Sequence, residues 1–239
     1  MNDRFLAPAL AFDHIGHRYG DHPALDGVSF ECAPGEFIAL LGASGSGKTT
    51  LLRGAAGLLD FDQGEVRSCG NGDRRTIAMV FQSHVLIDRL SALDNVLAGR
   101  LGYNPRWRGW LRRFTRDDRL LAIDCLDRVG LLAHATRRVD TMSGGERQRI
   151  ALARALAQQP AVLLADEPVA SLDPEAGAMV LRLLRDCCRD RQAAVVCSLH
   201  QPALALEHAD RVVALRGGRV VLDAPAGALD DAALAAIYR

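Results

Sequence analysis

The sequence predicts an α/β fold, in which helices cover a buried parallel sheet. Two short apolar runs, residues 37–41 and 161–165, have the length and composition of strands that are buried on both faces. From about residue 159 to the C-terminus, strand and helix patterns alternate, which is typical of parallel sheets with helical crossovers. Helical patterns dominate between about residues 83 and 158, so we expect an α-helical insertion in the α/β core.

In chain order, the expected elements begin with a strand-rich N-terminal part at about residues 9–41. A helix over 48–58 follows, because apolar residues from Leu51 to Leu58 recur on one helical face. A turn is expected over 69–75, where the sequence reads CGNGDRR. The remaining expected elements are strands near Val66 and at 76–81, a strand at 161–166, a helix at 174–190, a strand at 194–199, a helix at 202–208, strands at 211–215 and 219–222, and a helix at about 229–238.

The composition argues against several classes of protein. The chain has 239 residues, of which 49% are hydrophobic and 24% charged, and its net charge is zero. Nucleic-acid-binding proteins are usually basic, so we expect no nucleic-acid partner. Apolar runs stay below the ~18 residues that cross a bilayer, and the N-terminus is a poor signal peptide, so we expect a cytosolic location. The six cysteines show no zinc-ligand spacing, so we expect reduced structural thiols.

Lysine occurs only once among the basic residues of the sequence. The chain has 28 arginines and a single lysine, Lys48. Lys48 lies in GASGSGKT, which fits the phosphate-binding pattern G-x-x-x-x-G-K-[ST] between an apolar strand and a helix. Glycines let backbone N–H groups turn toward an anion, the compact Lys48 ammonium reaches the β- and γ-phosphates, and the Thr49 hydroxyl can bind Mg²⁺. The predicted nucleotide-binding residues are Gly42, Ala43, Ser44, Gly45, Ser46, Gly47, Lys48, Thr49 and Thr50.

Two carboxylates follow the second apolar run. The run ends in Asp166 and Glu167, and Pro160 and Pro168 bound it. In open α/β sheets ligands bind at the carboxyl ends of the strands, so these side chains are expected beside the phosphate-binding loop. Asp166 is then the natural Mg²⁺ partner, and Glu167 is the candidate for polarising an attacking water.

A second helix start with paired glycines lies at MSGGERQR, residues 142–149. Ser143 and Glu146 form an S-x-x-E capping box, and the following apolar residues share one helical face. Gly144 and Gly145 allow close approach of the backbone, so this helix N-terminus is expected to bind a second phosphate.

With these motifs the chain resembles the ATP-binding subunits of ABC transporters over about residues 10–239. MSGGE is similar to the family's signature motif, with Met142 in place of the usual Leu and Glu146 in place of Gln. Other landmarks stand in the family's order: Tyr19, Gln82, the segment 171–173, and His200. The resemblance implies an ABC-type nucleotide-binding domain with an N-terminal antiparallel β subdomain. It also implies a RecA-like α/β core at about 10–82 and 159–239, with the helical subdomain at about 83–158.

The resemblance also implies a role for each matching residue, with ATP and Mg²⁺ as cofactors. Tyr19 would stack on adenine, and Thr49, Gln82 and Asp166 would hold Mg²⁺. Glu167, His200 and Lys48 would act on the γ-phosphate in hydrolysis. The remaining expected nucleotide contacts are Ser143, Gly144, Gly145, Glu146 and Asp173.

In the family the signature completes the ATP site of the opposite subunit, so the resemblance implies a homodimer. It further implies integral membrane permease subunits, a periplasmic or extracellular solute-binding protein that acts indirectly, and a place on the cytoplasmic face of the membrane.

Residues 104–114, NPRWRGWLRRF, leave the choice among transporters open. The segment is expected to form a short amphipathic helix after Asn104 and Pro105, and its apolar face either packs internally or meets the permease or lipid. With its neighbours it resembles the ATPase of bacterial phosphonate importers, which favours phosphonate or phosphite as the solute. An importer of another solute, such as an amino acid, remains an alternative, as do a soluble non-transport ABC ATPase and a nucleic-acid-binding module.

Overall fold

The computed structural model describes residues 7–69, 76–82, 85–103, 114–170, 172–230, 233–234 and 237. Its strands are β1 (Leu10–Tyr19), β2 (His22–Cys32), β3 (Phe37–Leu41), β4 (Gln63–Ser68), β5 (Ile77–Val80), β6 (Val162–Asp166), β7 (Ala194–Ser198), β8 (Arg211–Arg216) and β9 (Arg219–Pro225). Its α-helices are α1 (Lys48–Ala55), α2 (Ala92–Ala98), α4 (Arg116–Arg128), α5 (Gly144–Ala157), α6 (Pro174–Arg191) and α7 (Pro202–His208). In these ranges every helix is too short or too polar to cross a bilayer.

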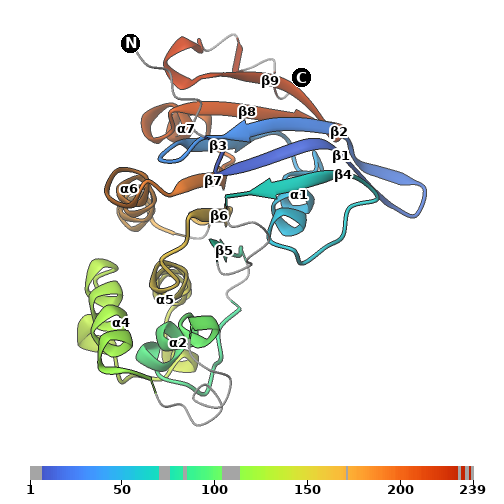
Figure 1. Ribbon diagram of the computed structural model, residues 1–239. Helices are drawn as coiled ribbons and strands as arrows, with labels where there is room; N and C mark the ends of the chain where they lie inside the picture. The colour runs from blue at the N-terminus through green and yellow to red at the C-terminus, as the bar shows by residue number, and fades with distance from the viewer. Residues whose placement is uncertain are drawn as a thin grey trace.

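Two sheets form the core of the molecule (Figure 1). The larger sheet has the strand order β5-β6-β7-β3-β8-β9, parallel except for β9, which runs antiparallel to β8. The smaller sheet, β2-β1-β4, is antiparallel. Helix α1 packs against strands of both sheets, and α6 and α7 pack against the larger one. This arrangement confirms the predicted α/β fold with an N-terminal antiparallel part.

The central strands form because they alternate between two hydrophobic clusters. In β3, Ile38 and Leu40 face the cluster beneath the smaller sheet, whereas Phe37 and Leu41 face the cluster beneath α6. Strands β6 and β7 show the same alternation, and all of their residues are buried. Burying one leucine stabilises the fold by roughly 1.5–3 kcal/mol, so continuous apolar runs are placed at the centre of the sheet.

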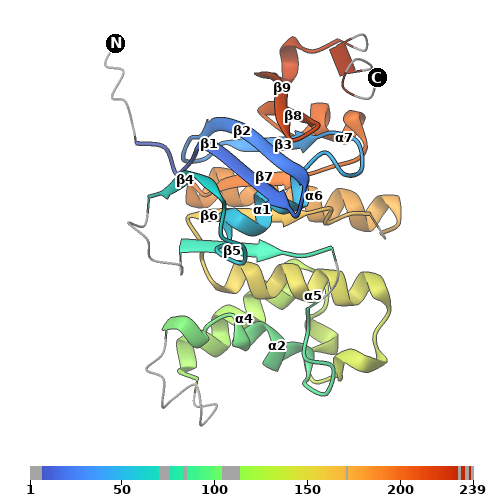
Figure 2. The same cartoon turned by 90° about the vertical axis from the view of Figure 1, so that its right-hand side faces the viewer.

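Helices α2, α4 and α5 lie together beside the β5 edge of the larger sheet (Figure 2). Helix α4 begins at a Thr115–Asp118 capping box and buries one apolar face. Its buried residues include Ala122, Cys125 and Leu126, and Val129 follows as the buried C-cap. In the chain, the three members of this helical cluster, α2, α4 and α5, all lie between β5 and β6. The limits of the helical subdomain near residues 82 and 159 stay a prediction.

The helix after the phosphate-binding loop is shorter than the sequence predicts. We expected it to reach Leu58, but α1 ends at Ala55. Gly57 adopts a φ of 69°, and the N–H of Leu58 donates to the carbonyl of Arg53 at 2.9 Å. This is a glycine-terminated Schellman motif, so Leu58 leaves the helix and is exposed.

Three expectations fall on segments that the structure describes little or not at all. The amphipathic helix at 104–114 lies outside the described residues except for Phe114, which packs against the core. The turn at 69–75 lies outside them except for Cys69. Within the expected C-terminal helix the structure describes helical residues at 233–234 and 237, of which Leu234 and Ile237 are buried.

Candidate nucleotide site

The phosphate-binding loop follows the carboxyl end of β3, and its glycines are required by close contacts. Gly42 has a φ of 145°, and a Cβ added there would lie 2.2 Å from the carbonyl oxygen of Leu215. Gly47 has a φ of 105°, and a Cβ there would lie 2.5 Å from the carbonyl oxygen of Ala24. A side chain at either position would therefore force the backbone to move, which fixes the shape of the loop.

Lys48 lies at the first position of α1 and is buried, with 5% of its surface exposed. Its Nζ donates to the carbonyl oxygens of Gly42 at 2.7 Å and of Ala43 at 3.1 Å. Burial lowers the pKa of Lys48, while the carboxylates of Glu167 and Asp166 oppose that shift. The ammonium is thus held inside the loop by weak carbonyl acceptors that a phosphate oxygen could replace.

The N-terminus of α1 adds a second attraction for anions. Its N-cap is Gly47, whose lack of a side chain leaves the first backbone N–H groups without a side-chain cap. The first turn contains no acidic residue. The partial positive charge of the helix end therefore remains available to a bound phosphate.

Thr49, in the first turn of α1, comes together with Asp166, at the end of β6. The hydroxyl of Thr49 donates to Oδ1 of Asp166 at 3.2 Å, and the hydroxyl of Ser198 donates to the same oxygen at 2.9 Å. Asp166 is almost fully buried at 2% exposure. Ser198 is paired with Asp166 across the parallel strands β7 and β6, so the sheet register places this hydroxyl beside the carboxylate.

Glu167 turns away from the strand that carries Asp166. Its φ of 49° is unusual for a residue with a side chain, and Ser198 Oγ accepts its backbone N–H at 2.8 Å. One carboxylate oxygen accepts the Gln82 amide at 2.8 Å, and the other lies 2.5 Å from Nε2 of His200. The predicted residues Gln82 and His200 thus contact the two oxygens of the Glu167 carboxylate, which was also predicted, and the three come from separate segments.

A cavity of about 570 Å³ adjoins these groups, and the predicted residues Gly42, Ala43 and Asp166 lie behind its lining. Tyr19 lies at its rim, at the end of β1, with half of its surface exposed. The lining residues are Tyr19, Ala24, Ser44, Gly45, Ser46, Gly47, Lys48, Thr49, Thr50, Gln82, Glu167 and His200.

The donor set fits a magnesium ion. Thr49 and Asp166 offer a hydroxyl and a carboxylate 3.2 Å apart, and the amide of Gln82 is next to Glu167. Mg²⁺ prefers such oxygen ligands and keeps several waters, so few protein groups suffice. The buried carboxylate of Asp166 accepts two hydroxyls, and its charge, which also acts on Lys48, would attract a bound cation.

The signature residues stand apart from this cavity. Ser143 accepts the backbone N–H of Glu146 at 3.2 Å, and Glu146 accepts that of Ser143 at 2.8 Å, which confirms the predicted capping box. Outside its own turn of helix, a Cβ built on Gly144 would meet no atom of the described residues within 4 Å. Asp173 is likewise outside the cavity lining and caps α6 through the N–H of Ala176 at 2.9 Å.

Two residues that the sequence analysis missed connect these parts. Ser198 joins Asp166 to Glu167, and its signal in the sequence is its place at the end of an apolar strand. Gln148 in α5 donates to the carbonyl oxygen of Pro168 at 3.1 Å, so the signature helix is bonded to the segment that follows Glu167. The sequence carries no pattern that singles out Gln148.

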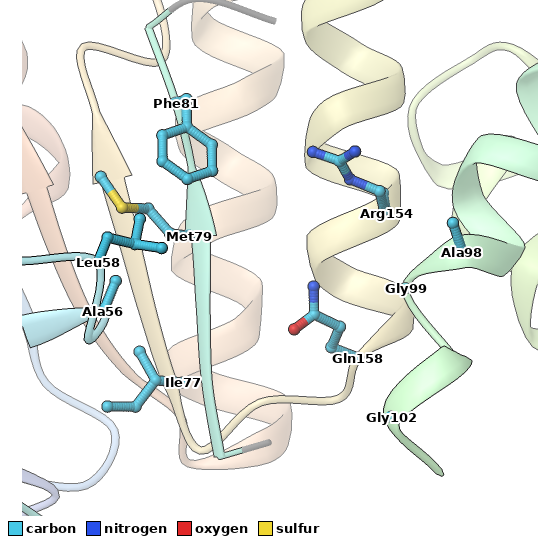
Figure 3. Close-up of a pocket in the computed structure, with 10 residues that line it drawn as sticks. All are labelled: Ala56, Leu58, Ile77, Met79, Phe81, Ala98, Gly99, Gly102, Arg154 and Gln158. Carbon is cyan, nitrogen blue, oxygen red and sulfur yellow. The ribbon is translucent and has the colours of Figure 1, made fainter. Parts of the chain in front are cut away.

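A second cavity, of about 460 Å³, lies where the helical cluster meets the β5 edge (Figure 3). Ile77, Met79 and Phe81 line one side, and Arg154 and Gln158 project from α5 on the other. Burial lowers the pKa of Arg154, whose guanidinium donates to the carbonyl of Val85. Phe81 directly precedes Gln82, so this cavity and the nucleotide cavity adjoin the same segment.

Comparison with known proteins agrees with this geometry. The family model described as ABC transporter matches residues 25–170. The chain belongs to the ABC transporter family. It is 50% identical over 97% of its length to the phosphonates import ATP-binding protein PhnC of Frankia casuarinae, of which 96% is covered. It is 44% identical to the hypophosphite import ATP-binding protein HtxD of Stutzerimonas stutzeri, covering 97% of this chain and 71% of HtxD.

Solved structures of the family share the fold. A dimeric post-hydrolysis state of the ATP-binding cassette MJ0796, bound to ADP and Pi, matches with a TM-score of 0.81 at 29% identity. The match covers 91% of this chain and 98% of that one. A putative metal-chelate type ABC transporter in an inward-facing conformation also matches, with a TM-score of 0.81 at 28% identity over 96% of this chain and 88% of that one.

Proposed function

We propose that this chain hydrolyses ATP to drive an importer of phosphonates or a closely related phosphorus oxyanion. The cavity that joins Lys48, Thr49 and Glu167 carries the ATPase part of this proposal. The solute part rests on the names of the relatives PhnC and HtxD, which match almost the whole chain. As an import subunit it would lie on the cytoplasmic face of the membrane, held there by its permease.

ATP would contact the phosphate-binding loop with its phosphates and Tyr19 with its base. The α- and β-phosphates would accept hydrogen bonds from the backbone N–H groups of the loop. Lys48 would give up its hydrogen bonds to two carbonyl oxygens and donate to the β- and γ-phosphate oxygens instead. Tyr19 at the rim would stack on the adenine ring. Thr49, Gln82 and Asp166 would hold Mg²⁺, which neutralises charge on the β- and γ-phosphates when bound.

Hydrolysis depends on positioning and charge stabilisation. Glu167 would accept a hydrogen bond from the attacking water and orient it in line with the γ-phosphate. His200, 2.5 Å from that carboxylate, would donate to the γ-phosphate as charge develops there. Gln82 bonds to the same carboxylate, so displacement of Gln82 would change the orientation of Glu167.

A second copy would complete the site. Ser143, Gly144, Gly145 and Glu146 are not among the residues that line this chain's own cavity, and a Cβ added at Gly144 would meet none of the described residues outside its own helix turn. The helix end that they form suits the γ-phosphate of ATP bound to a partner subunit, and Asp173 would lie near that interface. A dimeric cassette among the structural matches supports the same arrangement.

The permease would dock at the second cavity. It is lined by apolar side chains of β5 and by Arg154, which suits a short helix with an acidic or carbonyl group. A permease helix bound in this cavity would contact Phe81 and thereby change the position of the Gln82 side chain. Ala98→Trp should fill the cavity and abolish permease-stimulated hydrolysis with little change in basal hydrolysis, whereas Val221→Trp on exposed β9 should leave both unchanged. Unchanged stimulation in the Ala98 variant contradicts this docking site.

The solute is tested with the assembled transporter. The chain, its co-encoded permease and its binding protein are reconstituted in vesicles, and ATP hydrolysis is measured with methylphosphonate, phosphite, hypophosphite, phosphate or amino acids. We expect stimulation by a phosphonate or phosphite. Stimulation by amino acids alone supports the alternative importer, and hydrolysis that no permease alters supports a soluble ABC ATPase.

A further inference from the structure

A buried imidazole beside the nucleotide cavity has no part in the binding and hydrolysis described above. His17 lies in β1, two residues before Tyr19, and only 7% of it is exposed. Both of its ring nitrogens are buried and make no hydrogen bond within the described part of the chain. Buried polar atoms are normally hydrogen-bonded. The described contacts of this imidazole are instead two aromatic rings and the Asp62 carboxylate, 3.4 Å from Nδ1.

The imidazole meets Tyr19 edge-on. The two ring centroids are 4.8 Å apart and the ring planes are inclined at 89°. Side chains two residues apart in a strand share a face, so the backbone of β1 brings these rings together. Tyr19 exposes 52% of its surface and lines the nucleotide cavity. The contact with His17 thus limits the orientations of a ring that is otherwise open to solvent.

His17 has a second ring contact, with Phe61 in the segment between α1 and β4. The ring of Phe61 lies 6.4 Å from His17, inclined at 71°. Phe61 in turn packs against α1, where a Cβ on Gly54 would lie 1.9 Å from its ring. The rings of Tyr19, His17 and Phe61 therefore connect the base side of the cavity to α1.

Asp62 is hydrogen-bonded to β1 at Arg18 and at Gly16, the two neighbours of His17 in the chain. Its Oδ2 accepts the backbone N–H of Arg18 at 2.7 Å and lies 3.4 Å from Nδ1 of His17. Its backbone N–H donates to the carbonyl oxygen of Gly16 at 3.0 Å. The strand end that carries Tyr19 is consequently tied to the loop before β4, and His17 cannot withdraw from Tyr19 without breaking these bonds.

From this arrangement we infer that His17 is a positioning residue that holds the Tyr19 ring in the orientation for stacking on the nucleotide base. The inference rests on the proposed function, because it requires ATP bound at Lys48. A ring held in place before binding loses less rotamer freedom when the base arrives. Edge-to-face aromatic pairs change an equilibrium by about two- to tenfold, which sets the size of the expected effect.

The test compares a ligand that has a base with one that lacks it. Binding of Mg-ATP and of inorganic tripolyphosphate is measured by calorimetry for the wild type, His17→Leu and His17→Phe. Leucine fills the volume without an aromatic edge, and phenylalanine restores the edge without a ring nitrogen. We expect His17→Leu to weaken ATP about two- to tenfold and leave tripolyphosphate unchanged, and His17→Phe to bind both ligands as the wild type does.

A double-mutant cycle with Tyr19→Ala separates positioning from general loosening of the fold. In that background His17→Leu should have no further effect on ATP affinity. Equal weakening of both ligands, unchanged ATP affinity, or an undiminished effect in the Tyr19→Ala background overturns the role of His17. Lys48→Ala tests the proposed function separately: if the wild type binds neither ligand, or Lys48→Ala binds both as before, the proposed function fails first.

Discussion

At the residue scale, the adjacent carboxylates Asp166 and Glu167 lie in different environments at the end of β6. Asp166 faces inward and accepts two hydroxyls, whereas Glu167 adopts a left-handed backbone and faces the cavity. That conformation costs a residue with a Cβ on the order of 1 kcal/mol, and the bond from its N–H to Ser198 offsets part of the cost. The strain is retained where it separates the carboxylate proposed to bind Mg²⁺ from the one proposed to orient water.

Glu167→Gln tests this division of roles. The amide keeps the size of the side chain but loses the charge that holds and orients water. We expect nucleotide affinity within a few-fold of the wild type and turnover lower by about 10²-fold or more, measured by phosphate release. Asp94→Asn, which keeps an oxygen beside the Ser91 hydroxyl at the start of α2 and away from the cavity lining, serves as the conservative comparison for folding. Near-normal turnover in Glu167→Gln contradicts the assignment.

The thiols allow a second prediction at this scale. Burial raises the pKa of Cys125 and Cys187 to about 11 and that of Cys188 to about 12, and it raises the pKa of Cys32 and Cys197 further. At pH 8 a thiol with a pKa of 11 is a reactive thiolate in only ~10⁻³ of molecules. Cys69 is exposed.

A disulfide reagent at pH 8 should therefore titrate one thiol rapidly in the native protein and all six after denaturation. Cys69→Ser should abolish the rapid phase. Rapid reaction of two or more thiols in the native protein contradicts the buried environments.

At the scale of elements, sequence patterns predicted the structure where local chemistry decides it. The Ser143–Glu146 capping box and the central buried strands were predicted in place, because caps and apolar runs act over a few residues. The end of α1 was not, since the αL conformation of Gly57 terminates the helix before its apolar pattern stops. The roles of Ser198 and Gln148 were missed because they depend on which strands and helices become neighbours.

The two capping boxes form a matched pair for testing α5. Ser143→Ala and Thr115→Ala each remove a side-chain acceptor from a helix start, so each should lower the free energy of unfolding by about 1 kcal/mol in urea titrations. ATP hydrolysis should fall in Ser143→Ala and be retained in Thr115→Ala. Equal activity of the two variants contradicts a role for Ser143 beyond capping.

The α5 box also has a defined pH dependence. The backbone N–H of Ser143 is the main cause that lowers the pKa of Glu146, so its contribution to stability is present above the ordinary glutamate pKa. That contribution should be lost as the pH falls through the lowered value. The stability difference between wild type and Glu146→Ala should accordingly narrow below about pH 4.

At the scale of the whole molecule, the two sheets and the helical cluster each bring one part of the chemistry. The larger sheet places the phosphate cradle, Asp166 and Glu167 at its carboxyl edge, and β1 of the smaller sheet brings Tyr19 to the rim. The helical cluster carries the signature at the start of α5, outside the cavity of its own chain. Motif spacing predicted each part, but the place of the signature outside the lining of this cavity depends on the three-dimensional fold.

The central claim is that a second copy of this chain completes the ATP site, and light scattering of Glu167→Gln with and without Mg-ATP tests it most directly. This variant should bind ATP without turning it over, so the closed state accumulates. The account predicts a monomer without nucleotide and a dimer with ATP, and a monomer in both conditions when Lys48→Ala is added. A Glu167→Gln protein that binds ATP yet stays monomeric at saturating nucleotide would contradict it.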